Sequence, residues 1–264
     1  MKFFTLILLI LSGNAAFCQT EKMIWNDEFN NIGAPDKTKW SYNLGSSGWG
    51  NNELQDYTDQ TENSRQENGV LLIEAIKKAG KWSSARLVSE GKFDFKYGRI
   101  IFRAKLPAGS GTWPALWLLG ANCEKIGWPE CGEIDIMEHI GRRPGIVQCA
   151  LHTPASHGNT DHVGYTPVPD FDKEFHLYEA NWTPEKIEFS VDGNIFYTYE
   201  PAIKDKDTWP FDHPFSIIMN IAMGGNLGSD PKFETNDQRN GVDPSLTKVR
   251  MEVDYIRVYQ SDIK

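Results

Sequence analysis

Apolar and polar side chains alternate with a period of two along several short stretches of the chain. In residues 99–106 and again in residues 249–255, hydrophobic residues recur at every second position, with mostly charged residues between them. Successive side chains of a strand point to opposite faces, so this pattern predicts strands with one buried face. Residues 187–191 alternate in the same way and lead through Asp192 and Gly193 into residues 195–197, which predicts a β-hairpin.

Longer-range features of the pattern favour an all-β protein. Residues 215–223 are almost entirely apolar, as expected for a strand that is buried on both faces. No window shows a sustained helical stripe with capping residues, and Gly, Pro, Asn and Asp punctuate the chain. We therefore predict an antiparallel β-sandwich. Residues 51–68 are polar and rich in turn-forming residues, which predicts a long loop.

Composition narrows the range of partners. The chain has 264 residues and a formal net charge of −9, from 27 Lys and Arg against 36 Asp and Glu. Neutralising phosphates requires clustered basic side chains, so this balance argues against a nucleic-acid partner. Nine Trp and nine Tyr can form core or flat platforms for the apolar face of a ligand. We expect a monomer.

The amino-terminal residues have the layout of a secretory signal peptide. Lys2 precedes an apolar stretch over residues 3–11, and small and polar residues follow at 12–16. We predict a signal peptide over residues 1–18, a single domain over residues 19–264, and an exported protein, whether periplasmic, cell-surface or secreted. Lipid anchoring at Cys18 is disfavoured because Phe17 precedes it. No later segment has the roughly twenty apolar residues of a membrane span.

Three cysteines remain after the predicted leader, namely Cys123, Cys131 and Cys149. Three pairings are open, each of which leaves one thiol over. Cys123 and Cys131 flank a short loop with Gly and Pro, so a local disulfide is plausible there, and three buried thiols are the alternative.

Three carboxylates lie within six residues, at Glu133, Asp135 and Glu138. In a strand, Glu133 and Asp135 point to the same face, whereas regular pleating sends Glu138 to the opposite one. One extra residue, a β-bulge around Ile136 or Met137, returns Glu138 to the face of the other two. We therefore predict a bulged strand with three acids in one row.

A row of this kind suits the cleavage of glycosidic bonds. Two carboxyls about 5 to 5.5 Å apart let one attack the anomeric carbon while the other protonates the leaving oxygen. Trp113, Trp117 and Trp128 lie close to the acids in sequence, and indoles stack on the C–H faces of sugars. The alternatives are a solvated acidic face and a glycan-binding module without catalysis. No Gly-x-Ser-x-Gly motif supports a serine hydrolase.

Residues 133–138 (Glu-Ile-Asp-Ile-Met-Glu), 113–117 (Trp-Pro-Ala-Leu-Trp) and 50–55 (Gly-Asn-Asn-Glu-Leu-Gln) resemble glycoside hydrolase family 16, most closely its laminarinase branch of bacterial endo-β-1,3-glucanases. The resemblance runs from about residue 25 to residue 259. It implies a concanavalin-like jelly roll with a glycan groove across its concave face. It also implies Glu133 as nucleophile, Glu138 as general acid/base and Asp135 as the assisting carboxylate.

The same resemblance implies further site residues. Those expected to bind substrate are Trp113, Trp117 and Trp128, together with Asn51, Arg86, His152 and Asn220. The chemistry implies no cofactor. A structural Ca²⁺ ion away from the groove is implied at Glu28, the carbonyl of Gly69 and Asp254.

The predicted function is retaining, endo-acting hydrolysis of laminarin-type β-1,3-glucan, by the two glutamates in two steps. Mixed-linkage glucanases, agarases, carrageenases and transglycosylases share the bulged motif or the family and remain alternatives, as does a non-catalytic glycan-binding module. The sequence departs from the family pattern at one place, where Asn226 and Leu227 follow Gly225 and many relatives have a Trp. This difference leaves the preference among glucan substrates open.

Overall fold

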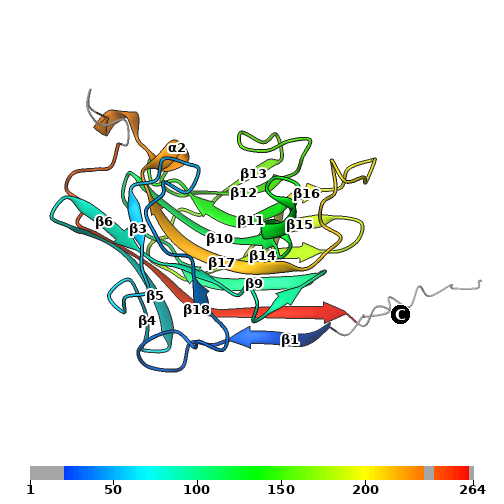
Figure 1. The fold of residues 1–264 in the computed structure, drawn as a ribbon, viewed down its shortest axis with the longest axis horizontal. Coiled ribbons are helices and arrows are strands. Elements are labelled where there is room, and N and C mark those ends of the chain that lie inside the picture. The colour runs from blue at the N-terminus through cyan, green and yellow to red at the C-terminus, as the bar shows by residue number, and fades with distance from the viewer. Residues whose placement is uncertain (1–20, 235–240, 262–264) are drawn as a thin grey trace, which may run out of the picture.

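The computed structural model describes residues 21–234 and 241–261, which form two sheets packed face to face (Figure 1). The predicted signal peptide and Cys18 lie outside the described residues. Each sheet is built almost entirely from antiparallel pairs, and the parallel pairing of β3 with β6 is the exception among the described strands. The predicted antiparallel β-sandwich is confirmed.

The first sheet contains the strands with the clearest alternation. Its strands, in spatial order, are β16 (Asn194–Tyr199), β15 (Ile187–Val191), β14 (His176–Trp182), β9 (Gly98–Lys105), β18 (Lys248–Ser261), β5 (Val70–Lys78), β6 (Lys81–Ser84) and β3 (Gln55–Tyr57), with β1 (Glu21–Asp27) paired to β18 and β4 (Ser64–Glu67) paired to β5. The predicted hairpin joins β15 to β16, and Asp192 and Gly193 both have positive φ, as its tight turn requires.

The second sheet carries the acid row. Its strands, in spatial order, are β13 (Val163–Pro167), β12 (Ile146–His152), β11 (Glu133–His139), β10 (Thr112–Gly120), β17 (Phe215–Met223), β7 (Arg86–Val88) and β2 (Ser41–Tyr42), with β8 (Asp94–Phe95) paired to β17. All nine residues of β17 are buried, as predicted. This strand is therefore covered on both faces.

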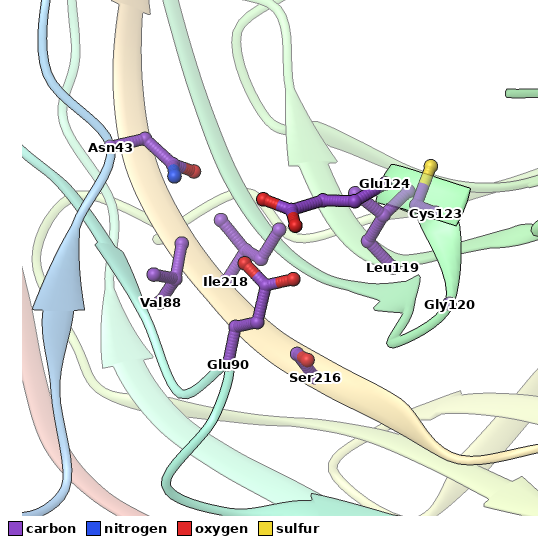
Figure 2. A pocket seen from close by; sticks show the side chains of 9 residues that line it. All are labelled: Asn43, Val88, Glu90, Leu119, Gly120, Cys123, Glu124, Ser216 and Ile218. Atoms are coloured by element: carbon purple, nitrogen blue, oxygen red, sulfur yellow. The ribbon is translucent and has the colours of Figure 1, made fainter. Parts of the chain in front are cut away.

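One large hydrophobic core fills the space between the sheets. Trp40, Trp82, Trp182 and Trp209 are buried in it, and Trp25 packs against it. On the other side of the second sheet, which we call the outer face, a smaller buried patch contains Val88, Ala115, Trp117 and Ile218. A pocket lies on this face between β7, β10 and β17 (Figure 2).

The loop predicted over residues 51–68 is partly wrong, because β3 and β4 lie within it. Several polar side chains of this segment are fully buried at positions where apolar side chains would be expected. They are tolerated there because they form hydrogen bonds with the backbone. Gln55 accepts a hydrogen bond from the amide of Met223, and Asn63 donates one to the carbonyl of Glu74. Burying a polar group with such a partner costs little free energy of folding. A strand that contains such groups lacks the alternation of apolar and polar residues by which strands are predicted.

The helices of the described residues are single turns: α1 (Cys123–Ile126), α2 (Gly225–Gly228) and the 3₁₀ turn η1 (Pro231–Phe233). None of the helices in this part of the chain has the length and apolar character needed to cross a membrane. The structure resolves the cysteine pairing that the sequence leaves open: Cys123 bonds to Cys131, and Cys149 is a free, buried thiol. The disulfide fastens α1 to the segment directly before β11.

Candidate active site

A β-bulge in β11 brings the three acids to the outer face. Asp135 lies opposite Ala150 of β12, whereas Glu138 lies opposite Gln148, so the register shifts by one residue between them. Ile136 and Met137 both pack into the core at the bulge. The bulge predicted from side-chain parity is therefore confirmed.

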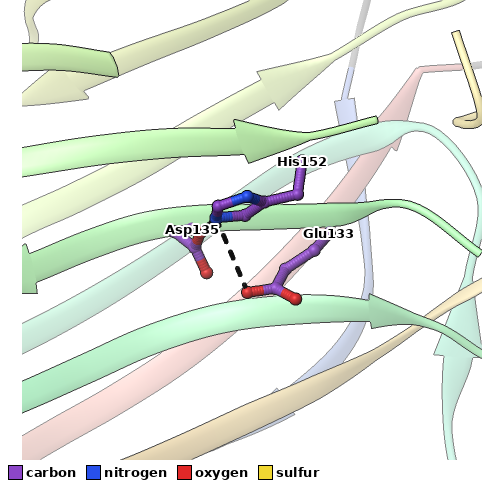
Figure 3. Close-up of side chains that lie close together, drawn as sticks. All are labelled: Glu133, Asp135 and His152. Atoms are coloured by element: carbon purple, nitrogen blue, oxygen red, sulfur yellow. Dashed lines mark ion pairs between the residues drawn. The ribbon is translucent and has the colours of Figure 1, made fainter. Parts of the chain in front are cut away.

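Glu133 and Asp135 share His152 as a neighbour. The Nε2 atom of His152 lies 3.2 Å from Oδ2 of Asp135 and 3.9 Å from Oε1 of Glu133 (Figure 3). Burial, followed by the negative charge of Asp135, raises the pKa of Glu133 to about 8. Burial also raises the pKa of Asp135 well above its usual value. These two carboxyls therefore retain a proton between them at neutral pH.

Glu138 is only 6% exposed and is held by a hydrogen bond to each oxygen. The indole of Trp113 donates to Oε1 at 2.7 Å, and the amide of Gln148 donates to Oε2 at 3.0 Å. Arg143 in turn donates to the side-chain oxygen of Gln148 at 2.8 Å. These contacts fix the orientation of the Glu138 carboxyl beside the other two acids.

Three further predicted residues meet on β7, β10 and β17. The indole of Trp117 donates to the side-chain oxygen of Asn220 at 2.8 Å. Asn220 lies opposite Arg86 in the strand register, and the Arg86 guanidinium lies 4.7 Å from the ring centre of Trp117. Trp117 therefore has one edge and one face fixed by neighbours on the same sheet.

Trp128 and Asn51 reach this face from loops. Trp128 is 43% exposed, and its ring lies 5.7 Å from that of His152 and 5.3 Å from that of His157. Asn51 donates a hydrogen bond to Glu53 at 3.3 Å. All ten predicted catalytic and substrate-binding residues thus belong to one connected neighbourhood on or beside the outer face.

The structure adds residues that the sequence reasoning missed. Trp49 covers the second side of the Arg86 guanidinium at 4.7 Å, and Tyr57 accepts a hydrogen bond from Asn220. Glu53 accepts hydrogen bonds from Asn51, Gln55 and Tyr57, and burial raises its pKa. Of these residues, only Gln148 could have been predicted from the sequence. If β11 is bulged and forms an antiparallel pair with the next strand, Gln148 lies opposite Glu138.

One group of possible metal ligands lies in the acid row, apart from the predicted calcium positions. The ligand atoms of Glu133, Asp135 and His152 lie within 4.8 Å of one another, close enough to surround one ion. Of the predicted calcium positions, Glu28 follows the end of β1, Gly69 precedes the start of β5, and Asp254 lies on β18, with which both strands pair.

Arginines already neutralise both predicted calcium carboxylates. Arg257 binds both oxygens of Glu28 and holds its pKa below the usual range, and Arg103 pairs with Asp254 at 2.5 Å. An ion bound by these two carboxylates would therefore compete with both arginines.

The sequence model of the family described as Glycosyl hydrolases family 16 matches residues 51–257, which include the acid row and every predicted substrate-binding residue. The chain belongs to glycosyl hydrolases family 16. It is therefore a glycoside hydrolase by family.

Several named proteins resemble the chain over most of its length. A beta-glucanase from Rhodothermus marinus is 43% identical over 253 residues, covering 90% of this chain and 85% of that protein. Glucan endo-1,3-beta-glucosidase A1 from Niallia circulans is 36% identical over 266 residues, covering 90% of this chain and 38% of that protein. The laminarinase structure from Flavobacterium sp. UMI-01 is 43% identical with a TM-score of 0.84, covering 90% of this chain and all of that one.

The departure at Asn226 and Leu227 has a visible consequence in this family 16 chain. Asn226 accepts a hydrogen bond from the side chain of Asn52 at 2.8 Å, and the carbonyl of Leu227 accepts one from Arg142. Short α2 is thereby tied to the loop that contains Asn51. In this chain, Asn226 therefore takes part in a polar link between α2 and that loop.

His139 directly follows Glu138 and points into the core. Its ring stacks on Phe171 at 4.1 Å, and neither ring nitrogen has a hydrogen-bond partner among the described residues. Burial lowers the pKa of His139 to about 4; the charge of Arg143 also lowers it, and that of Asp172 opposes the shift. The core therefore holds His139 in its neutral form.

We expect His139 to destabilise the fold in acid. An unfolded histidine takes up a proton near pH 6.5, whereas the folded one does so only near pH 4, so stability falls as pH drops through this interval, by about 3 kcal/mol. Urea unfolding of wild type and His139→Phe at pH 7 and pH 4.5 measures the loss. The variant should lose less stability than wild type, whereas a His157→Phe control should behave as wild type does. Equal losses in wild type and His139→Phe would contradict the expectation.

Proposed function

We propose that this chain is a retaining, endo-acting hydrolase of β-1,3-glucan. The observation that carries the proposal is the bulge that places Glu133 and Glu138 in one row, with Asp135 between them. Tryptophans and polar side chains suited to sugar rings surround that row. The similar proteins named as a beta-glucanase, an endo-1,3-beta-glucosidase and a laminarinase support the choice of substrate.

In the first step, Glu138 donates its proton to the glycosidic oxygen while a carboxylate oxygen of Glu133 attacks the anomeric carbon. The bond from that carbon to the leaving oxygen breaks, and a glycosyl ester on Glu133 forms. In the second step, Glu138 takes a proton from water, and the water oxygen displaces Glu133 from the same carbon. Two inversions leave the anomeric configuration unchanged.

The first step needs Glu133 ionised although its surroundings raise its pKa. Asp135 supplies a place for the retained proton, and it can donate a hydrogen bond to Glu133 from there. The charges of His152 and Arg86 oppose the rise in the pKa of Glu133, so they favour its ionised form. We therefore assign the proton to Asp135 in the reactive state, which makes Asp135 the assisting carboxyl.

The test is release of reducing ends from laminarin, lichenan, agarose and carrageenan, with the product anomer followed by proton NMR. The proposal expects rapid release from laminarin, a drop in polymer size before short products accumulate, and the β-anomer first. Release from lichenan, agarose or carrageenan without laminarin would overturn the substrate. Binding to glucan without release from any of them would make the chain a glycan-binding module.

We propose that Ca²⁺ binds weakly at the junction of Glu28, Gly69 and Asp254 and has a structural role. Carboxylate and carbonyl oxygens are the ligands that Ca²⁺ prefers, and the ion would join β1, β5 and β18. Competition from Arg103 and Arg257 for the two carboxylates is the reason to expect low affinity.

Chelation is expected to lower the melting temperature without changing activity on laminarin. At ten times its Kd, a bound ion adds about 1.4 kcal/mol, which corresponds to about 4 °C for a chain of this size. Calorimetry in EDTA and in millimolar Ca²⁺ measures the shift, and Glu28→Gln should abolish it. Identical melting curves would contradict a structural ion. A loss of activity in EDTA would place the ion at Glu133, Asp135 and His152 instead.

A further inference from the structure

The outer face carries a pocket of about 280 Å³ that the two-step mechanism does not use. It opens between β7, β10, β17 and the turn α1 (Figure 2). Its lining residues are Asn43, Val88, Glu90, Leu119, Glu124 and Ile218, with Gly120, Cys123 and Ser216. The disulfide to Cys131 fastens the α1 side of the wall.

This pocket adjoins the candidate active site. Leu119 lies opposite Glu133 in the register of β10 and β11, so their side chains are neighbours on the outer face. Ile218 lies opposite Trp117, and it also lies opposite Val88. Val88, Ile218 and Trp117 belong to one buried patch, with Leu119 packed against it. The floor of the pocket is therefore continuous with the surface around Trp117.

The lining has an apolar floor and a polar rim. Val88, Ile218 and Leu119 form the floor, and Figure 2 shows the carboxyl groups of Glu90 and Glu124 pointing into the same space. Burial, followed by the negative charges of Glu124 and Asp94, raises the pKa of Glu90. None of the lining residues is basic. A ligand with sulfate or carboxylate groups would meet only like charge here.

A single sugar ring matches this lining. One face of a pyranose presents C–H groups to an apolar floor, while its hydroxyls donate hydrogen bonds to carboxylates. The volume is slightly below the roughly 300–1,000 Å³ of pockets that enclose drug-sized ligands, so the occupant is small. Glu124 on α1 stands on one side of the pocket and Glu90 stands on another.

We propose that this pocket binds a neutral hexosyl branch attached to the glucan chain that lies across the acid row. In a β-1,3-linked chain the ring positions 1 and 3 carry the backbone, and the primary hydroxyl at position 6 projects outward. A branch at that position on a ring near Trp117 can enter the pocket while the backbone stays beside Glu133. This proposal rests on the proposed function and adds branched glucan as a favoured substrate.

The experiment compares two β-1,3-gluco-oligosaccharides of equal length, one linear and one with a single β-1,6-linked glucosyl branch. The measured quantity is the ratio of kcat/KM for the branched substrate to that for the linear one. Glu124→Arg brings a guanidinium up to Glu90 and closes the pocket, and Glu124→Gln removes only charge. Glu130→Arg, an exposed site that does not line the pocket, is the matched control.

Wild type should hydrolyse the branched substrate at least as well as the linear one. Glu124→Arg should lower the ratio about tenfold and Glu124→Gln less, because a hydrogen bond to a charged group is replaced or weakened. Glu130→Arg should leave the ratio as in wild type. Equal ratios in Glu124→Arg and Glu130→Arg, or rejection of the branched substrate by wild type, would overturn the pocket alone. No hydrolysis of the linear substrate by wild type would overturn the proposed function, and the branch pocket with it.

Discussion

Replacing Glu133 by glutamine is expected to lower the rate of laminarin hydrolysis by a factor on the order of 10⁴ or more. The amide cannot form the glycosyl ester, so the first step loses its nucleophile. Glucan binding should persist, because the tryptophans around the row are unchanged and Gln has nearly the size of Glu. Initial rates by reducing-end release and binding by isothermal titration calorimetry measure the two effects separately.

The matched control for this variant is Glu130→Gln, which makes the same change at an exposed position. It should leave rate and binding as in wild type. A Glu133→Gln protein that keeps more than about a hundredth of the wild-type rate would remove Glu133 from the role of nucleophile. Loss of both binding and rate would instead indicate that the variant no longer folds around the site.

Glu138→Ala should reduce the rate on laminarin about 10²- to 10⁴-fold, because the leaving oxygen departs without a proton. An aryl glycoside with an acidic phenol needs no such proton, so its first step should be affected far less. Added azide can enter the space left by the carboxyl and attack the glycosyl ester on Glu133. The expected product is a β-glycosyl azide, identified by proton NMR.

The configuration of the azide product separates the roles of the two glutamates. Rescue of Glu138→Ala passes through the ester and retains the β-configuration, whereas direct attack in a Glu133→Ala protein would give the α-azide. An α-azide from Glu138→Ala would reverse the assignment of nucleophile and acid/base. No rescue and an equal loss on both substrates would show that Glu138 has another role.

The sequence was sufficient to predict the sandwich because its alternating strands obey a local rule. Strands β9, β15 and β18 expose charged residues on one face, so a period of two is visible without any knowledge of neighbours. The strands β3 and β4 escaped this rule, because Gln55 in β3 and Ser64 and Gln66 in β4 are buried yet polar. Gln55 accepts a hydrogen bond from the amide of Met223, and Gln66 donates one to the carbonyl of Ala34, and both partners are distant in sequence. Such partners cannot be recognised before the fold is known.

The acid row could be predicted because its three members lie on one strand. On a strand, the spacing of residues and the position of a bulge determine which face of the sheet each side chain occupies. Trp49 could not be found in this way, since it lies in a Gly-rich loop without periodicity. Its role depends on Arg86, whose guanidinium lies between Trp49 and Trp117. The contacts within a strand were thus predictable, whereas the contacts between loops and strands required the structure.

All nine residues of β17 are buried, but alternate side chains lie on opposite faces of the sheet and serve different purposes. The odd-numbered positions, such as Ile217 and Met219, belong to the core between the sheets. The even-numbered positions lie on the outer face, where Ile218 joins the patch of Trp117 and Asn220 bonds to its indole. An alanine scan should therefore alternate in phenotype along the strand. Truncations at odd positions should lower the melting temperature, and those at even positions should chiefly change kcat/KM. The effect of a mutation should therefore alternate between stability and activity from one residue to the next.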